Sequence, residues 1–123
     1  MKITTIVIRS LLGLMFLATG IMIFLPIKMP PPPAGLAGDF MKALFTSHYI
    51  HAVKCFEIAG GLMLLIGRGP LGLLLLGPVI VNILFYDIFL DATALPVGIV
   101  VAVLSLFLLW RYRANFAPLL KAG

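Results

Sequence analysis

Ionisable side chains gather in one short stretch of an otherwise apolar chain. Residues 47–57 read Ser-His-Tyr-Ile-His-Ala-Val-Lys-Cys-Phe-Glu. At about 100° per residue of an α-helix, His48, His51, Cys55, Lys54 and Glu57 fall on one half of the helix surface. An ionisable side chain inside an apolar helix is costly unless it faces a partner or a wet cavity. This stretch is therefore the first candidate for a binding or proton-exchanging site.

The two histidines suggest three uses. Histidine ordinarily titrates near neutral pH, so His48 and His51 could exchange protons with the aqueous phase at the outer end of this helix. Together with Cys55 they resemble part of a soft-metal site, but one helix offers too few ligands and the chain has no other His or Cys. We therefore predict no metal site. Hydrogen bonding at the interface is the simplest role for both histidines.

Glu57 requires a cationic partner. The chain is 63% hydrophobic, and its long apolar runs predict membrane-spanning helices, one beginning at residue 3 and one ending at residue 66. At about 1.5 Å per residue from these two ends, Arg9 lies roughly 9 Å and Glu57 roughly 13 Å from the same membrane face. The sequence thus predicts an Arg9–Glu57 ion pair, more often a device that fixes helix register than a reaction centre. The alternative partner is Lys54, which lies three residues before Glu57 on the same helix. In that case Arg9 would extend to the cytoplasmic interface.

A second polar set lies later in the chain. The same depth arithmetic places Asn82 at the level of Lys54 and Asp87 at the level of His51. We expect these groups to form a polar core that opens toward the non-cytoplasmic face, with Tyr86 as a further hydrogen-bond donor.

The elements that must position these residues follow from composition. Of the 123 residues, 63% are hydrophobic and 11% charged, which excludes an ordinary water-soluble domain. A membrane span needs about 20 mainly apolar residues. Proline, glycine and charge divide the chain into four such runs, at residues 3–25, 45–66, 71–90 and 93–110. We predict a single all-α domain over residues 1–123, an integral membrane four-helix bundle.

The connections and charges orient this bundle. A proline-rich segment follows the first span, and Gly67-Arg68-Gly69-Pro70 and Asp91-Ala92-Thr93 make tight turns between antiparallel neighbours. With four spans, most basic residues lie on the side of both termini, which predicts cytoplasmic termini and the inner membrane as location. The nine Lys and Arg form no dense stripe, so we exclude nucleic acid as a partner.

Polar and small residues at fixed positions also resemble the DoxX-like family of small four-helix membrane proteins. The matching motifs are Arg9-x-x-Leu12-Gly13-Leu14-x-Phe16-x-x-x-Gly20, the Pro30–Ala34 run with Phe40-Met41, Val53-Lys54-x-x-Glu57-x-x-Gly60-Gly61, Gly67-Arg68, Gly77-Pro78-x-x-Val81-Asn82-Ile83 and Trp110-Arg111-Tyr112-Arg113. The resemblance implies a compact membrane bundle associated, in some members, with quinone-linked sulfur oxidation or membrane oxidoreductases. This chain departs from it at His48, where a small residue is usual, and at Tyr86, where a histidine is common.

Two functions are compatible with these observations. In the first, a quinone enters between helices and accepts hydrogen bonds from Lys54, His51, Asn82 or Tyr86, and the chain is an accessory or quinone-interacting component of a membrane oxidoreductase system. It would then be at most a subunit of an enzyme, because no flavin, haem or iron–sulfur ligation pattern is visible. In the second, the chain is a non-enzymatic scaffold or assembly factor. Its partners would be the lipid bilayer, other membrane or redox proteins, or a second copy of itself.

Overall fold

The computed structural model describes residues 2–121, and every regular element in this range is helical. This confirms the all-α prediction. In chain order the elements are α1 (Lys2–Met22), α2 (Gly35–Thr46), α3 (Tyr49–Leu65), α4 (Gly69–Phe89), the 3₁₀ turn η1 (Ala92–Ala94), α5 (Leu95–Arg111), α6 (Arg113–Phe116) and the 3₁₀ turn η2 (Ala117–Leu120).

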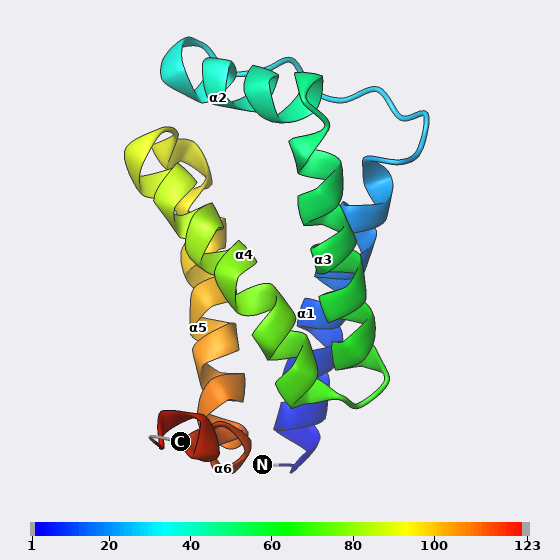
Figure 1. The fold of residues 1–123 in the computed structure, drawn as a ribbon, viewed down its shortest axis with the longest axis vertical. Helices are drawn as coiled ribbons and strands as arrows, with labels where there is room; N and C mark the ends of the chain where they lie inside the picture. Colours follow the sequence, from blue (N-terminus) through cyan, green and yellow to red (C-terminus); the bar gives the residue numbers. More distant parts are fainter. Residues whose placement is uncertain (1, 122–123) are drawn as a thin grey trace.

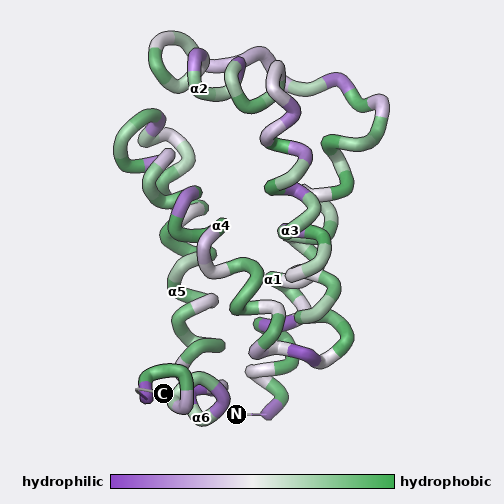
Figure 2. The backbone as a smooth tube through the Cα atoms, in the orientation of Figure 1, coloured by the Kyte–Doolittle hydropathy of each residue, from purple (hydrophilic) through white to green (hydrophobic). Residues whose placement is uncertain are grey.

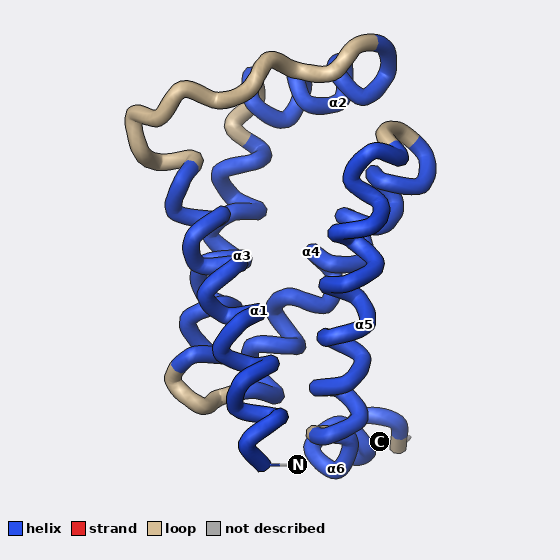
Figure 3. Tube along the Cα trace, turned by 180° about the vertical axis from the view of Figure 1, so that it is seen from behind, coloured by secondary structure: helices blue, strands red, loops and turns tan. Residues whose placement is uncertain are grey.

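Four long helices run along the molecule, and α2 crosses one end of them (Figure 1). Helix α3 packs against both α1 and α4, and α5 packs against α4 and α1. Seen from behind, the long proline-rich connection leads from α1 across the end where α2 lies (Figure 3). Both ends of the chain and α6 lie at the opposite end (Figure 1).

Glycines bring the axes of α1, α3 and α4 close together. A Cβ on Gly13 would lie only 2.8 Å from the carbonyl oxygen of Gly61. On the neighbouring face of α3, a Cβ on Gly72 would lie 2.9 Å from the carbonyl oxygen of Gly60. Glycine at these positions therefore lets the helix backbones approach one another closely.

The buried core is small, and most of the large apolar side chains lie on the outer surface. The buried core consists of a few side chains, led by Phe16, Leu12, Leu64, Leu76 and Leu108. Many large apolar side chains are exposed instead, including Val103 at 58% and Leu106 at 63%. Hydrophobic residues predominate along α1, α4 and α5, with hydrophilic ones near the ends and in the upper half of α3 (Figure 2).

By length and composition, three helical segments could cross a membrane: Lys2–Met22, Gly69–Phe89 and Ala92–Arg111. They correspond to the first, third and fourth predicted spans and are consistent with a membrane protein.

The second predicted span, residues 45–66, is not one helix. Helix α2 ends at Thr46, and α3 begins only at Tyr49. Between them the Ser47 hydroxyl donates to the Ala43 carbonyl at 2.6 Å and accepts from the Tyr49 N–H at 3.3 Å. His48 takes a left-handed backbone conformation with φ of 63°. The chain therefore turns sharply here, and α3 keeps 17 residues.

Candidate functional site

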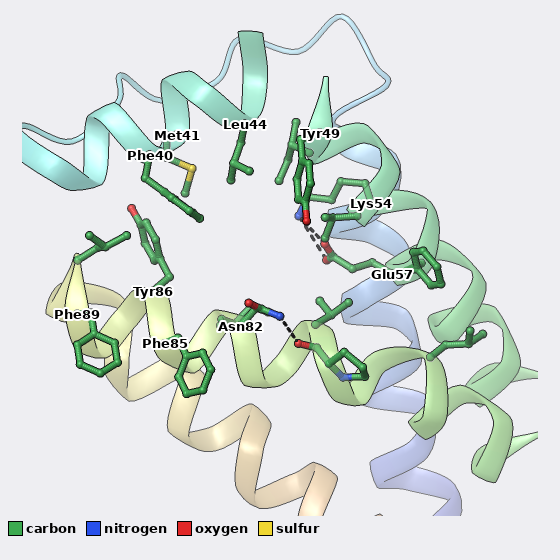
Figure 4. Close-up of a pocket in the computed structure, with 18 of the residues that line it drawn as sticks. Phe40, Met41, Leu44, Tyr49, Lys54, Glu57, Asn82, Phe85, Tyr86 and Phe89 are labelled. Carbon is green, nitrogen blue, oxygen red and sulfur yellow. Dashed lines mark hydrogen bonds and ion pairs between the residues drawn. The ribbon is translucent and has the colours of Figure 1, made fainter. Parts of the chain in front are cut away.

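A pocket of about 760 Å³ lies between α2, α3 and α4, at the end of the molecule away from the termini. This volume falls within the ordinary range for small-molecule sites. Figure 4 shows side chains from all three helices directed into it. Most of the lining is apolar or aromatic: Phe40, Met41, Leu44, Tyr49, Ile50, Val53, Phe56, Leu74, Leu75, Pro78, Val79, Ile83, Phe85, Tyr86, Phe89 and Leu90. The remaining lining residues are Lys54, Glu57 and Asn82.

The α3 wall carries the charged part of the pocket. The Lys54 Nζ lies 3.0 Å from Glu57 Oε2, and this is the single ion pair within residues 2–121. Glu57 is 4% exposed, and its Oε1 also accepts from the Thr19 hydroxyl of α1 at 3.4 Å. The Lys54 side chain is 21% exposed. The ammonium group, with three donor hydrogens, therefore remains reachable from the pocket while the carboxylate is enclosed.

The α4 wall adds neutral polar groups. The Asn82 side-chain NH₂ donates to the Pro78 carbonyl at 2.8 Å, so the amide folds back on its own helix (Figure 4). Its carbonyl oxygen has no protein donor in the described part of the chain. Tyr86 lies one turn further along α4, and its ring centroid is 5.7 Å from that of Phe40 in α2. These aromatic rings of α2 and α4, tilted by 36° to each other, form an apolar wall opposite Lys54 (Figure 4).

The predicted Arg9–Glu57 ion pair is wrong, and the alternative Lys54–Glu57 pair is present. The contact between Thr19 and Glu57 shows which turn of α1 lies level with the carboxylate. Arg9 is ten residues earlier in α1, about 15 Å along the axis. The predicted pair was wrong because both depths were counted from helix ends that were taken to be level. In the structure, α1 extends past the turn that joins α3 to α4.

Arg9 instead lies beside that turn. Its Nη1 donates to the Tyr112 hydroxyl at 3.5 Å, and the nearest neighbour of a Cβ on Gly67 would be the same Nη1, 3.9 Å away.

The two histidines are not part of the pocket lining. The His48 and His51 rings are 5.1 Å apart, and the His51 ring makes an edge contact with Phe24 at 5.4 Å. Phe24 follows α1, so this cluster faces the α1 side of the molecule. The predicted shared face was wrong for two reasons: His48 lies outside α3, and His51 lies about 60° around α3 from Lys54, on the side toward Phe24. No three His, Cys, Asp or Glu side chains within residues 2–121 are grouped to hold a metal ion.

Asp87 also faces away from the pocket. It is 2% exposed, and its Oδ2 has no hydrogen-bond partner among residues 2–121. A Cβ on Gly98 would collide with this oxygen, so the carboxyl lies against the first turns of α5. Tyr86 and Asp87 are adjacent but about 100° apart around α4, so only Tyr86 points into the pocket.

Sequence reasoning missed Thr19 and the contribution of α2. Thr19 lies in an apolar run with no charged neighbour, so only the α1–α3 register reveals its contact with Glu57. The lining side chains Phe40, Met41 and Leu44 occupy positions i, i+1 and i+4, a helical spacing that was present in the sequence. No residue in the sequence indicated that this helix ends before Tyr49.

Comparison with known proteins adds no relative: no family model, curated protein or solved structure matches the chain.

Proposed function

We propose that this chain is a multi-pass protein of the inner membrane, of the DoxX-like type, in which α1, α3, α4 and α5 cross the bilayer and both termini are cytoplasmic. The exposed apolar side chains of α1, α4 and α5 support this placement. Helix α3, at 17 residues, spans about 25 Å, close to the hydrocarbon thickness. The basic residues around Arg68 and Arg111, beside the termini, agree with a cytoplasmic side.

In this arrangement α2 lies along the opposite membrane face and forms the roof of the pocket. An apolar ligand dissolved in the bilayer would reach it between α2, α3 and α4. The wall formed by Phe40 and Tyr86 fits a flat ring, since aromatic rings favour offset or tilted stacking. Lys54 and Tyr86 supply donors for ring oxygens.

We propose a quinone as this ligand, and an accessory or quinone-interacting component of a membrane oxidoreductase system as the function. The observation that carries the proposal is the aromatic pocket, with Lys54 on one wall and Tyr86 on the other. A quinone has two carbonyl oxygens on opposite sides of an apolar ring, and donors on facing walls match that pattern. A partner protein would supply or accept the electrons.

The test is co-purification from native membranes in a mild detergent, followed by extraction of bound quinone. We expect near-stoichiometric quinone with the native chain and at least a threefold loss in Tyr86→Phe, which removes a hydroxyl but keeps the ring. Asn82→Leu should also reduce the yield, because it removes the second amide hydrogen, which is not needed for the bond to Pro78. Matched controls at the far end of the molecule, Tyr112→Phe and Asn115→Leu, should retain it. Absence of quinone from the native protein would refute the proposal.

The second candidate is a membrane scaffold or assembly factor. Exposed apolar residues along α5, such as Val103 and Leu106, favour it because they offer a face for another membrane protein. The glycines Gly13, Gly60 and Gly72 do not serve this role, since they pack within the chain. A stable partner recovered without any quinone would favour this function.

A further inference from the structure

Positive charge is concentrated without acidic partners at the end of the molecule that carries both termini. Asp39 lies in α2 at the opposite end, Glu57 is paired with Lys54, and Asp87 and Asp91 lie toward the α2 end of α4. These are the four acidic residues of the chain. The basic residues on the terminal side are Lys2, Arg9, Arg68, Arg111, Arg113 and Lys121.

Two of these arginines come from different helices, and each makes a hydrogen bond that joins α1 to the C-terminal end of α5. The Arg111 Nε donates to the Thr5 hydroxyl at 2.9 Å, and the Arg9 Nη1 donates to the Tyr112 hydroxyl at 3.5 Å. Thr5 and Arg9 are one turn apart on the same face of α1, about 6 Å along its axis. Arg111 and Tyr112 are consecutive. The two guanidinium groups are therefore held at adjacent levels between α1 and α5.

Neither guanidinium has a carboxylate within the described residues, although both are partly buried. The Arg9 Nε is buried without a hydrogen-bond partner there. The Tyr112 ring holds this arrangement in place by lying over Gly69, where a Cβ would come within 2.5 Å of ring carbon Cε2. Two like charges held at neighbouring turns of α1, with no carboxylate partner in the described residues, favour a bound anion.

The rim of this cluster has the character of a membrane interface. Trp110 is 50% exposed, and the Arg113 guanidinium lies 4.9 Å from its ring centroid. Leu119 and Leu120, in the last 3₁₀ turn, are exposed at 67% and 90%. Tryptophan, arginine and exposed leucine together are typical of a surface that lies at lipid headgroup depth.

We propose that Arg9 and Arg111 bind the phosphate of an anionic phospholipid headgroup, with Trp110 at the rim of the site. The planar guanidinium group binds phosphate through paired hydrogen bonds, which suits it to this role better than lysine. The adjacent apolar residues favour a lipid over a free phosphate ion. This inference rests on the proposed membrane placement, but it is independent of the quinone pocket.

The single tryptophan of the chain is Trp110, so its fluorescence reports on this site. The full-length protein in a neutral detergent is titrated with phosphatidylglycerol, phosphatidylcholine or inorganic phosphate. We expect saturable binding of phosphatidylglycerol with a Kd at least tenfold lower than for either of the other two. The double variant Arg9→Gln/Arg111→Gln should weaken that binding at least tenfold.

The matched control is Arg68→Gln/Lys121→Gln, which removes two exposed charges from the same end and should change the Kd by less than twofold. An equal loss in both double variants would overturn the proposal, because it would indicate a diffuse charge effect. Equal affinity for both lipids, or saturation by inorganic phosphate at the same concentration, would also overturn it.

A further double variant keeps both positive charges, so that a loss of binding through misfolding can be told from a loss of the guanidinium groups. Arg9→Lys/Arg111→Lys removes the guanidinium fork but not the net charge, and it should weaken phosphatidylglycerol binding at least threefold; unchanged affinity would overturn the assignment. Alkaline carbonate extraction of the native membranes separates this test from the proposed function. A chain retained in the membrane that binds quinone but not phosphatidylglycerol would contradict this site alone.

Discussion

Replacing Lys54 by methionine should destabilise the protein strongly, because it leaves the Glu57 carboxylate buried. That carboxylate would keep only the Thr19 hydroxyl, 3.4 Å away. Removing one partner of a buried ion pair typically costs 3–5 kcal/mol. Lys54 is 21% exposed, so we place the cost of Lys54→Met at the lower end, about 3 kcal/mol.

The opposite change should cost less. Glu57→Gln removes the buried charge and leaves Lys54 directed into the pocket, so we expect a loss of about 1 kcal/mol. The double variant Lys54→Met/Glu57→Gln should be more stable than the sum of the two single changes implies, by about 2 kcal/mol. Unfolding by sodium dodecyl sulfate in mixed micelles gives these free energies.

Arg9→Met tests whether Glu57 pairs with Lys54 or with Arg9. Within residues 2–121, Arg9 makes a single hydrogen bond, at 3.5 Å to Tyr112, so its loss should cost less than about 1 kcal/mol. Lys42→Met, on exposed α2, is the surface control and should stay within about 0.5 kcal/mol of the native protein. If Arg9→Met proved as costly as Lys54→Met, or if the Lys54 and Glu57 variants showed no coupling, the charge assignment would be refuted.

Two further variants test helix packing, and one titration tests a turn. Gly13→Leu should lower the unfolding free energy by about 2 kcal/mol in the same micelle assay, because its Cβ would press on Gly61; a neutral effect would contradict the α1–α3 contact. Gly77→Ala should change the unfolding free energy by less than about 1 kcal/mol, because nothing beyond its own helix and chain neighbours lies within 4 Å of its added Cβ, and the better helix propensity of alanine is offset by crowding against the following Pro78; a larger loss would show a packed neighbour. Hydrogen bonds from Thr93 lower the pKa of Asp91 below its ordinary value. The stability that this turn contributes is therefore fully present at pH values above the ordinary pKa, and it is lost as the pH falls through the lowered pKa. The NMR shift of the Thr93 amide should follow this titration and become flat in Asp91→Asn; the same titration in the variant would rule out Asp91 as its source.

Periodicity and punctuation predicted much of the fold because long apolar runs have few alternatives to a helix. The runs at 71–90 and 93–110 correspond to α4 and α5, and the glycine and aspartate turns between helices lie where expected. The break at Ser47-His48 was not predictable in the same way. Neither residue is a glycine or proline, and the turn depends on a serine hydroxyl that contacts three backbone groups.

The candidate site was predicted in part, and the missing part depends on register. Lys54, Asn82 and Tyr86 were named from residue type and do line the pocket. His51 and Asp87 were named for the same reason but face other helices. Sequence alone gives depth only if helix ends are level, and the stagger of α1 against α3 moved Arg9 away from Glu57. Close glycine contacts set that stagger, and a single sequence does not reveal which glycines meet.

The most direct test of the quinone pocket is photoaffinity labelling with an azidoquinone in native membranes, followed by peptide mapping. We expect label on peptides that carry Phe40, Tyr49 or Tyr86, abolished by excess unlabelled quinone and reduced in Asn82→Leu. Label spread over the outward-facing residues of α5, or unaffected by competing quinone, would contradict the quinone pocket.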